Sequence, residues 1–285
     1  MRLVATTEGR THWVDPEAGH WRCFHFLEGT RSLDQVETEH QAHETARAFG
    51  CFAARLTHFD GPRLAITIPD FHNLEHRYAA LEAAIRRDSH GRVKSVGVEI
   101  DRAANRYVAL QDSLREVGAE NLPIRIVHND CKINNILLDA KTGEGLCAID
   151  LDTVMDGTVL ADFGELMRTS SCRSAEDEAG LGEMAIELDF VRGVARGYIS
   201  GMGAILTPQE LNALPIAGSL MAFENAIRFL TDYLSGDAYF RTHREAQNLD
   251  RTRAQLLRVE LLDAEHDAIR KIIESAQLEF RAAGK

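Results

Sequence analysis

The sequence predicts an α+β protein in which a short β region, residues 1–29, precedes a large and mainly helical region, residues 30–285. Three observations support this division. Short runs of alternating apolar and polar residues, separated by turns, fill the first region. Apolar residues spaced three and four apart, with capping residues before them, dominate the second. Within it, two apolar runs enclose a strongly polar segment at 128–135, which indicates a loop held by a rigid scaffold.

The N-terminal region is expected to contain three short strands. Residues 3–7 and 11–14 are separated by a glycine-containing, hairpin-like turn, and a second turn at 15–19 contains both Pro and Gly. Residues 21–27 alternate like a third strand, which Glu28-Gly29 ends. The first region is therefore predicted to be a small β region.

Helix start signals follow directly. Ser32 and Gln35 have the spacing of a capping box and predict a helix that reaches about Leu56. A second helix is expected to open at 68–70 and to run through Ile85. Both segments carry apolar residues at helical spacing. The N-terminal part of the second region is therefore predicted to be helical.

Three further helices are predicted along the chain. The first covers about 96–117. Thr207-Pro208-Gln209-Glu210 combines an N-cap, a proline at the first helical position and an acid at the third, so it predicts a helix that ends near Leu234. Asn248 is expected to cap a last, charge-rich helix that reaches about Ala276.

Composition limits the function classes. The net charge of −12, from 32 basic and 44 acidic residues, argues against a general nucleic-acid binder, which normally shows a basic footprint. Five scattered cysteines without C-x-x-C spacing indicate reduced thiols in a cytoplasmic protein. We expect neither a signal peptide nor a membrane span. The oligomeric state stays open.

The polar segment at 128–135 reads His-Asn-Asp-Cys-Lys-Ile-Asn-Asn and lies between Ile126-Val127 and Ile136-Leu137-Leu138. Apolar runs of this length predict two short buried strands. A further apolar strand is expected at 145–149. The polar residues between the first two strands should therefore form an ordered loop.

The residue types in this loop indicate phosphoryl transfer. Asp130 is followed five residues later by Asn135, and an acid that accepts a hydroxyl proton, with a metal-binding amide at this spacing, is typical of that chemistry. Lys132 can reach toward a transferred phosphoryl group. His128 is placed to brace the loop by hydrogen bonds. Asp130 and Lys132 are thus the candidate catalytic residues.

A second metal-binding carboxylate should follow at the end of the next strand, and two aspartates compete for this role. A hairpin that turns at 141–144 would return Asp150 to the loop. Asp162-Phe163-Gly164 spells a metal motif of protein kinases but precedes a helical pattern. We therefore assign Asp150 as the ligand and Asp162 as a helix cap or loop brace. Asp152 either contacts the metal or turns the loop.

These motifs resemble those of a known group. The segment 128–135, together with 149–154, resembles the aminoglycoside phosphotransferase and choline kinase superfamily. The stretch 224–240, which contains Glu-Asn-Ala-Ile-Arg-Phe-Leu-Thr-Asp-Tyr-Leu, and the residues 248–251 resemble the bacterial N-acetylhexosamine 1-kinases more closely. Residues 21–29 are similar to the last small-lobe strand and the hinge of these enzymes.

The resemblance implies a protein-kinase-like fold with ATP bound between two lobes. It implies that Phe26-Leu27-Glu28 forms the nucleotide-binding hinge and that Asp130 is the base for the anomeric hydroxyl of a sugar. It also implies that Asn135 and Asp150 hold Mg²⁺. The cofactors expected from the resemblance are therefore ATP and Mg²⁺, and the partner is a small-molecule sugar.

Arg228 and Tyr239 match positions that contact the sugar in that family, although both residue types are also common on packed helix surfaces. The implied activity is phosphorylation of the anomeric hydroxyl of an N-acetylhexosamine or related sugar. Other hydroxyl acceptors, such as an aminoglycoside, choline or homoserine, remain alternatives. Aminoglycosides and choline are cations, whereas the match around Arg228 suggests hydrogen bonding to a neutral sugar.

The chain departs from the family in the parts that hold nucleotide phosphates. It has no lysine before Lys94 and no G-x-G-x-x-G segment, so the small lobe is expected to be truncated. The alternatives are a fragment of a longer kinase, a catalytically impaired binding protein, and an enzyme that grips phosphate by other groups.

Overall fold

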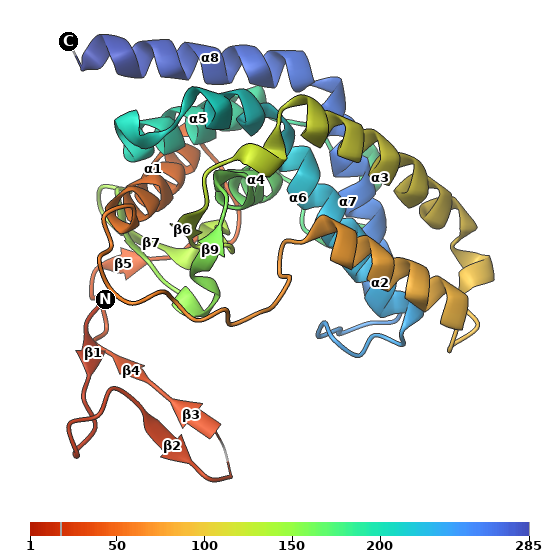
Figure 1. The fold of residues 1–285 in the computed structure, drawn as a ribbon, viewed down its shortest axis with the longest axis horizontal. Coiled ribbons are helices and arrows are strands. Elements are labelled where there is room, and N and C mark those ends of the chain that lie inside the picture. The colour runs from red at the N-terminus through yellow and green to blue at the C-terminus, as the bar shows by residue number, and fades with distance from the viewer. Residues whose placement is uncertain (18, 285) are drawn as a thin grey trace.

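The computed structural model describes residues 1–17 and 19–284 and shows a small β region beside a body of helices (Figure 1). The helices are α1 Glu39–Leu56, α2 Leu74–Arg87, α3 Gly97–Glu116, α4 Val159–Ser170, α5 Leu188–Met202, α6 Pro208–Leu234, α7 Gln247–Ala264 and α8 His266–Ala283. The strands are β1 Leu3–Val4, β2 Trp13–Asp15, β3 Gly19–Trp21, β4 Cys23–Phe24, β5 Thr30–Arg31, β6 Arg125–Val127, β7 Ile136–Asp139, β8 Gly145–Ala148 and β9 Met155–Gly157. The predicted α+β class is confirmed. Within the described chain, every helix is too short or too polar to cross a bilayer.

The first strands form two separate two-stranded sheets that extend away from the helical body (Figure 1). β1 pairs with β4, and β2 pairs with β3. The expected single strand over 21–27 is wrong, because pairing breaks at Arg22 and ends at Phe24. These strands are largely exposed, so little burial favours longer pairing. Ala18, in the expected turn at 15–19, lies outside the described residues.

Two small sheets inside the helical body hold the polar loop. β6 pairs with β9, and β7 pairs with both β5 and β8. The hairpin of β7 and β8 aligns Ile136 with Ala148 and Leu137 with Cys147. The chain therefore leaves β6, passes through the loop and a short 3₁₀ helix at Ile133–Asn135, and enters β7. The strands predicted around the loop are confirmed.

α6 is the central helix of the body and packs against α2, α4 and α7. Its predicted start is confirmed, because the Thr207 hydroxyl accepts from the backbone N–H of Glu210 at 3.2 Å. The Glu210 carboxylate accepts in turn from the backbone N–H of Thr207 at 2.8 Å. The same carboxylate binds Arg125, at 2.6 Å from Nε. The cap therefore also fixes α6 to β6.

α1 and α2 begin later than the sequence suggests. The cap of α1 is Thr38, whose hydroxyl accepts from the backbone N–H of Gln41 at 3.2 Å, so the predicted box at Ser32 and Gln35 is wrong. Thr38 and Gln41 have the same spacing, and burial of Val36 holds the segment before them out of the helix. α2 is capped by Asn73. The predicted helix at 96–117 is confirmed by α3.

The last predicted helix is two helices. α7 ends at Ala264 and α8 begins at His266, because α7 packs on α6 whereas α8 packs mainly on α5. The expected cap at Asn248 is also wrong, since Ala246 occupies the cap position. The Asn248 amide is buried and donates to Asp232 and Asp237, both at 2.9 Å.

α1 and α5 approach closely because α5 presents glycines at every fourth position, Gly193, Gly197 and Gly201. A Cβ atom added at Gly197 would lie 2.1 Å from the carbonyl oxygen of His43. Cβ atoms at Gly193 and Gly201 would lie 2.5 Å from carbonyl oxygens of α1. The contact is therefore between backbones, and a side chain on this stripe would separate the helices.

Gly197→Ala is expected to destabilise the protein. The added methyl group meets the backbone of α1, which cannot move like a flexible side chain, so we expect a loss of about 3 kcal/mol. The melting temperature should fall by roughly 5 °C or more. Gly97→Ala at the start of α3 is the control, because an added Cβ meets nothing within 4 Å there. Equal melting temperatures of the two variants would contradict the close contact.

Candidate active site

The loop between β6 and β7 is held in place by His128, whose side chain is fully buried. The ring Nε2 donates to the carbonyl oxygen of Ile149 at 2.9 Å, and Nδ1 accepts from the backbone N–H of Asp130 at 3.3 Å. The ring is therefore neutral, with its proton on Nε2. His128 joins the start of the loop to the end of β8.

Asp162 holds the same loop from α4. Its two carboxylate oxygens accept from the backbone N–H groups of His128, at 3.1 Å, and Asn129, at 2.7 Å. Asp162 is fully buried and lies in the first turn of α4, where the helix dipole favours negative charge. Asn129 has a left-handed backbone with φ of 64°. The two N–H bonds therefore stabilise an uncommon backbone conformation directly before Asp130.

The carboxylate of Asp130 is bound on both oxygens. Oδ1 lies 3.0 Å from Lys132 Nζ, and Oδ2 accepts from the amide nitrogen of Asn135 at 3.1 Å. That amide nitrogen also donates to the carbonyl oxygen of Asp130 at 2.9 Å. Burial alone would lower the pKa of Lys132, but the carboxylates of Glu165 and Asp130 raise it. Lys132 is thus a cation beside the candidate base.

Asp150 follows β8, the second strand of the hairpin, by two residues. The residue before it, Ile149, donates its N–H to the carbonyl oxygen of Asn135 at 2.9 Å and accepts from His128. The hairpin therefore returns Asp150 beside Asn135, as the spacing predicts. Asp150 is exposed and has a left-handed backbone with φ of 59°. Its neighbour Asp152 forms an ion pair with Arg22 of the N-terminal region.

Asn135 and Asp150 offer oxygen ligands suited to Mg²⁺. The amide nitrogen of Asn135 donates to Asp130, so the side-chain oxygen of Asn135 can face a cation. Mg²⁺ is commonly held by one or two carboxylates and completed by phosphate oxygens. Among residues 1–17 and 19–284, no group of three His, Cys, Asp or Glu side chains is arranged as a metal site.

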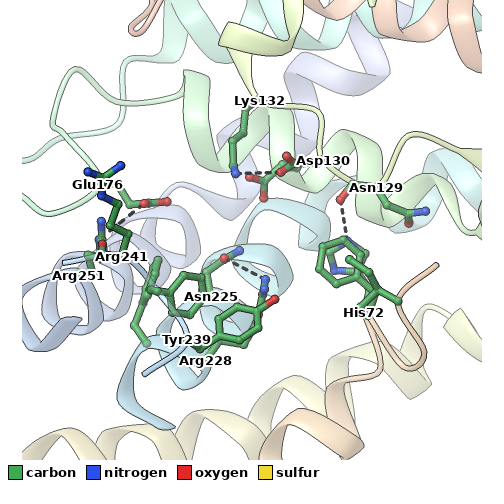
Figure 2. A pocket seen from close by; sticks show the side chains of 15 residues that line it. His72, Asn129, Asp130, Lys132, Glu176, Asn225, Arg228, Tyr239, Arg241 and Arg251 are labelled. Carbon is green, nitrogen blue, oxygen red and sulfur yellow. Dashed lines mark hydrogen bonds and ion pairs between the residues drawn. The ribbon is translucent and has the colours of Figure 1, made fainter. Parts of the chain in front are cut away.

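A cavity of about 330 Å³ opens on the side of the loop that carries Asp130 and Lys132 (Figure 2). The opposite wall comes from α6 and from the segment 239–241. Arg228 lies in this wall, with its guanidinium 5.2 Å from the Phe71 ring centre and 5.4 Å from that of Phe240. Two aromatic rings thus hold the guanidinium in place.

The structure brings together four of the residues assigned from sequence, because Tyr239 lines the same cavity as Asp130, Lys132 and Arg228. Tyr239 is 70 % exposed, and its backbone N–H donates to Asp232 at 2.8 Å. Phe26-Leu27-Glu28 lies elsewhere, between β4 and β5, and Phe26 is 86 % exposed.

Other residues of the cavity gave no signal in the sequence. Glu165 and His72 line it, but Glu165 only follows the Asp-Phe-Gly letters at 162–164, and His72 lies in a segment without a recognisable motif. Glu165 is buried and binds Arg168, at 2.5 Å from Nη2. Burial would raise the pKa of Glu165, but the Arg168 guanidinium lowers it to about 2. Arg168 also binds Glu176 at 3.0 Å, so one buried cation holds two carboxylates of the cavity wall.

Glu165→Gln should destabilise the protein by about 3 kcal/mol, because it leaves the buried Arg168 cation with less charge compensation. The depressed pKa of Glu165 means that its contribution is present above pH 4.5 and is lost as the pH falls toward 2. Thermal unfolding should therefore show a gap between variant and wild type that shrinks in acid. Glu279→Gln, in an exposed pair with Arg196, should cost less than about 1 kcal/mol.

The match to a known family covers most of the chain. Residues 2–198 match the family described as "Phosphotransferase enzyme family", APH. This confirms the resemblance to the aminoglycoside phosphotransferase and choline kinase superfamily. The narrower resemblance to N-acetylhexosamine 1-kinases stays a prediction.

Solved structures with the same fold are distant in sequence. A microcompartment-associated aminopropanol kinase is 16 % identical with a TM-score of 0.57, over 94 % of this chain and 76 % of that one. An AMP-bound spectinomycin phosphotransferase is 13 % identical with a TM-score of 0.55, over 93 % and 78 %. Choline kinase from Cryptosporidium parvum is 12 % identical with a TM-score of 0.53, over 93 % and 76 %.

The family match and the fold agree with the geometry of the loop. The shared fold is kinase-like and α+β, with a body rich in helices, as the sequence predicts. The loop places a cation and an amide each within hydrogen-bond distance of one carboxylate. The chain therefore belongs to the phosphotransferase enzyme family and transfers phosphoryl groups to hydroxyl acceptors.

Proposed function

We propose that this enzyme transfers the terminal phosphoryl group of ATP to a hydroxyl group of a small neutral sugar, with an N-acetylhexosamine as the first candidate and its anomeric hydroxyl as the acceptor. The observation that carries this proposal is the cavity in which Asp130 faces Arg228 and Asn225 (Figure 2). Its volume of about 330 Å³ suits a small molecule. The sequence resemblance supplies the sugar class.

Asp130 is the proposed base. Lys132 and Asn135 each bind one of its oxygens, which fixes the direction of the carboxylate toward the cavity. A bound hydroxyl can transfer its proton to the carboxylate as the new bond to phosphorus forms. Lys132 is placed to neutralise charge on the transferred group. The chain thus contributes mainly positioning and charge compensation.

Asn135 and Asp150 are the proposed ligands of Mg²⁺. Bound there with the nucleotide, the ion would neutralise phosphate charge. The protein contributes the side-chain oxygen of Asn135 and the exposed carboxylate of Asp150. The carbonyl oxygen of Asn135 already binds the N–H of Ile149, which keeps the two ligands on adjacent segments.

The charges of the cavity wall support a neutral acceptor. The names of the solved relatives refer to aminopropanol, choline and spectinomycin kinases, and such amine-bearing acceptors are cations near neutral pH. Here Arg228, Arg241 and Arg251 line the cavity. The carboxylates of Glu165 and Glu176 bind Arg168. A cationic acceptor would therefore face guanidinium groups, whereas hydroxyl and amide oxygens would accept hydrogen bonds from them.

Asp130→Asn tests the proposed base. ADP release, measured with N-acetylglucosamine and with N-acetylgalactosamine, should fall about 10²- to 10⁴-fold in kcat, because the amide cannot take the hydroxyl proton. Asp112→Asn, in an exposed helical ion pair, is the control and should match the wild type. Equal rates for Asp130→Asn and the wild type would rule out Asp130 as the base. A wild type that is inert with both sugars would contradict the proposed acceptor and favour another hydroxyl compound.

Arg228→Met tests acceptor recognition. Loss of the guanidinium should raise the KM for an N-acetylhexosamine about 10- to 100-fold, since hydrogen bonds to charged groups contribute about 1.5–3 kcal/mol. The variant should also discriminate less against choline, because one positive charge leaves the cavity. Arg86→Met, on the exposed surface of α2, controls for general effects. An unchanged KM together with unchanged choline turnover would place the acceptor elsewhere.

A further inference from the structure

The His72 side chain makes a hydrogen bond through each ring nitrogen. Nε2 lies 2.8 Å from the carbonyl oxygen of Asn129, and Nδ1 lies 2.9 Å from Oε1 of Glu224. A carbonyl oxygen can only accept, so Nε2 carries a proton, and a carboxylate beside Nδ1 favours a proton there as well. The geometry is that of an imidazolium between two acceptors (Figure 2 shows the Asn129 contact).

The surroundings of His72 contain charges of both signs. Glu224, on α6, is 1 % exposed, and Glu165, on α4, lines the same cavity as His72. Arg77, on α2, donates to the carbonyl oxygen of Phe71, and Arg228 lies over the ring of the same phenylalanine.

The cavity loop adds Asp130 and Lys132 to this set of charges. Burial would lower the pKa of His72, but Glu224, Asn129 and Glu165 raise it. The carboxylates therefore outweigh burial, and the ring keeps its second proton at a higher pH than an ordinary histidine.

The two acceptors belong to opposite sides of the proposed active site. Asn129 directly precedes the base Asp130 and has the left-handed backbone that Asp162 also supports. Glu224 directly precedes Asn225 and lies one helical turn before Arg228 on α6. The imidazolium therefore joins the loop that carries the base to the helix that carries the acceptor-binding groups.

We propose that His72 is a positioning residue, which as an imidazolium holds the base loop at a fixed distance from the acceptor-binding face of α6 and makes turnover fall at alkaline pH. This inference rests on the proposed function for its kinetic part. The pKa of His72 is raised, which determines how the contact depends on pH. Both hydrogen bonds of the imidazolium are present below the ordinary pKa of histidine, and the second is lost as the pH rises through the raised value.

Two matched double variants separate the contact from the charge. Both contain Glu224→Gln, so that no buried carboxylate is left unpaired. His72→Gln places an amide nitrogen near the position of Nε2 and keeps the bond to Asn129, whereas His72→Asn places it near Nδ1 and loses that bond. His76→Gln, at a largely exposed histidine near the start of α2, the helix that follows His72, is the control.

The expected kinetics distinguish these variants. At pH 7 the His72→Gln/Glu224→Gln protein should have a kcat at least about tenfold above that of the His72→Asn/Glu224→Gln protein. Neither should show the alkaline fall that the wild type and His76→Gln share. Equal kcat values for the two double variants, or the same alkaline fall in all four proteins, would overturn the proposal.

Two measurements test the contact without any acceptor, so that failure of the proposed function is distinguishable. Side-chain ¹⁵N NMR should show His72 doubly protonated at pH 7 in the wild type. Amide hydrogen exchange at Asn129 and Asp130 should be faster in the His72→Asn double variant than in the His72→Gln one. A singly protonated ring at pH 7, or equal exchange, would overturn the inference even if no acceptor is found.

Discussion

The site depends on one buried carboxylate. Asp162 accepts the N–H groups of His128 and Asn129, and no ion pair to Asp162 is present among the described residues. Backbone dipoles, and the start of α4, compensate its charge instead. Because these two N–H groups point inward, Asn129 takes a left-handed backbone and Asp130 turns outward to the cavity. Asp162 belongs to an Asp-Phe-Gly segment that spells a metal motif of protein kinases, but here its carboxylate orients the loop through hydrogen bonds.

Asn135 joins the two parts of the proposed chemistry. Asp130 and Lys132 face the cavity, and the amide nitrogen of Asn135 binds Asp130. The carbonyl oxygen of Asn135 binds the N–H of Ile149, the residue directly before Asp150. The strands that hold the loop are short, with three residue pairs between β6 and β9 and three between β7 and β8.

Local patterns predicted those parts of the fold that local hydrogen bonds determine. The box at Thr207 and the β7–β8 hairpin both depend on neighbours in sequence. The contacts of His72 and the break between α7 and α8 depend instead on residues that are distant in sequence. His72 binds partners 57 and 152 residues away, and α8 turns to reach α5. The helix start predicted at Ser32 was wrong for a similar reason. Burial of the Val36 side chain outweighed the capping box that the sequence alone favours.

The charge balance of the cavity follows from Arg168, which lies behind the wall and not in it. With 1 % of its side chain exposed, it binds Glu165 and Glu176, and the low pKa of Glu165 reflects that pairing. Two carboxylates that face the cavity are thereby committed to an internal cation. Arg228, held between aromatic rings, is then left to donate hydrogen bonds to a ligand. Under the proposed function, selection among acceptors should accordingly depend on where the ligand places its oxygens.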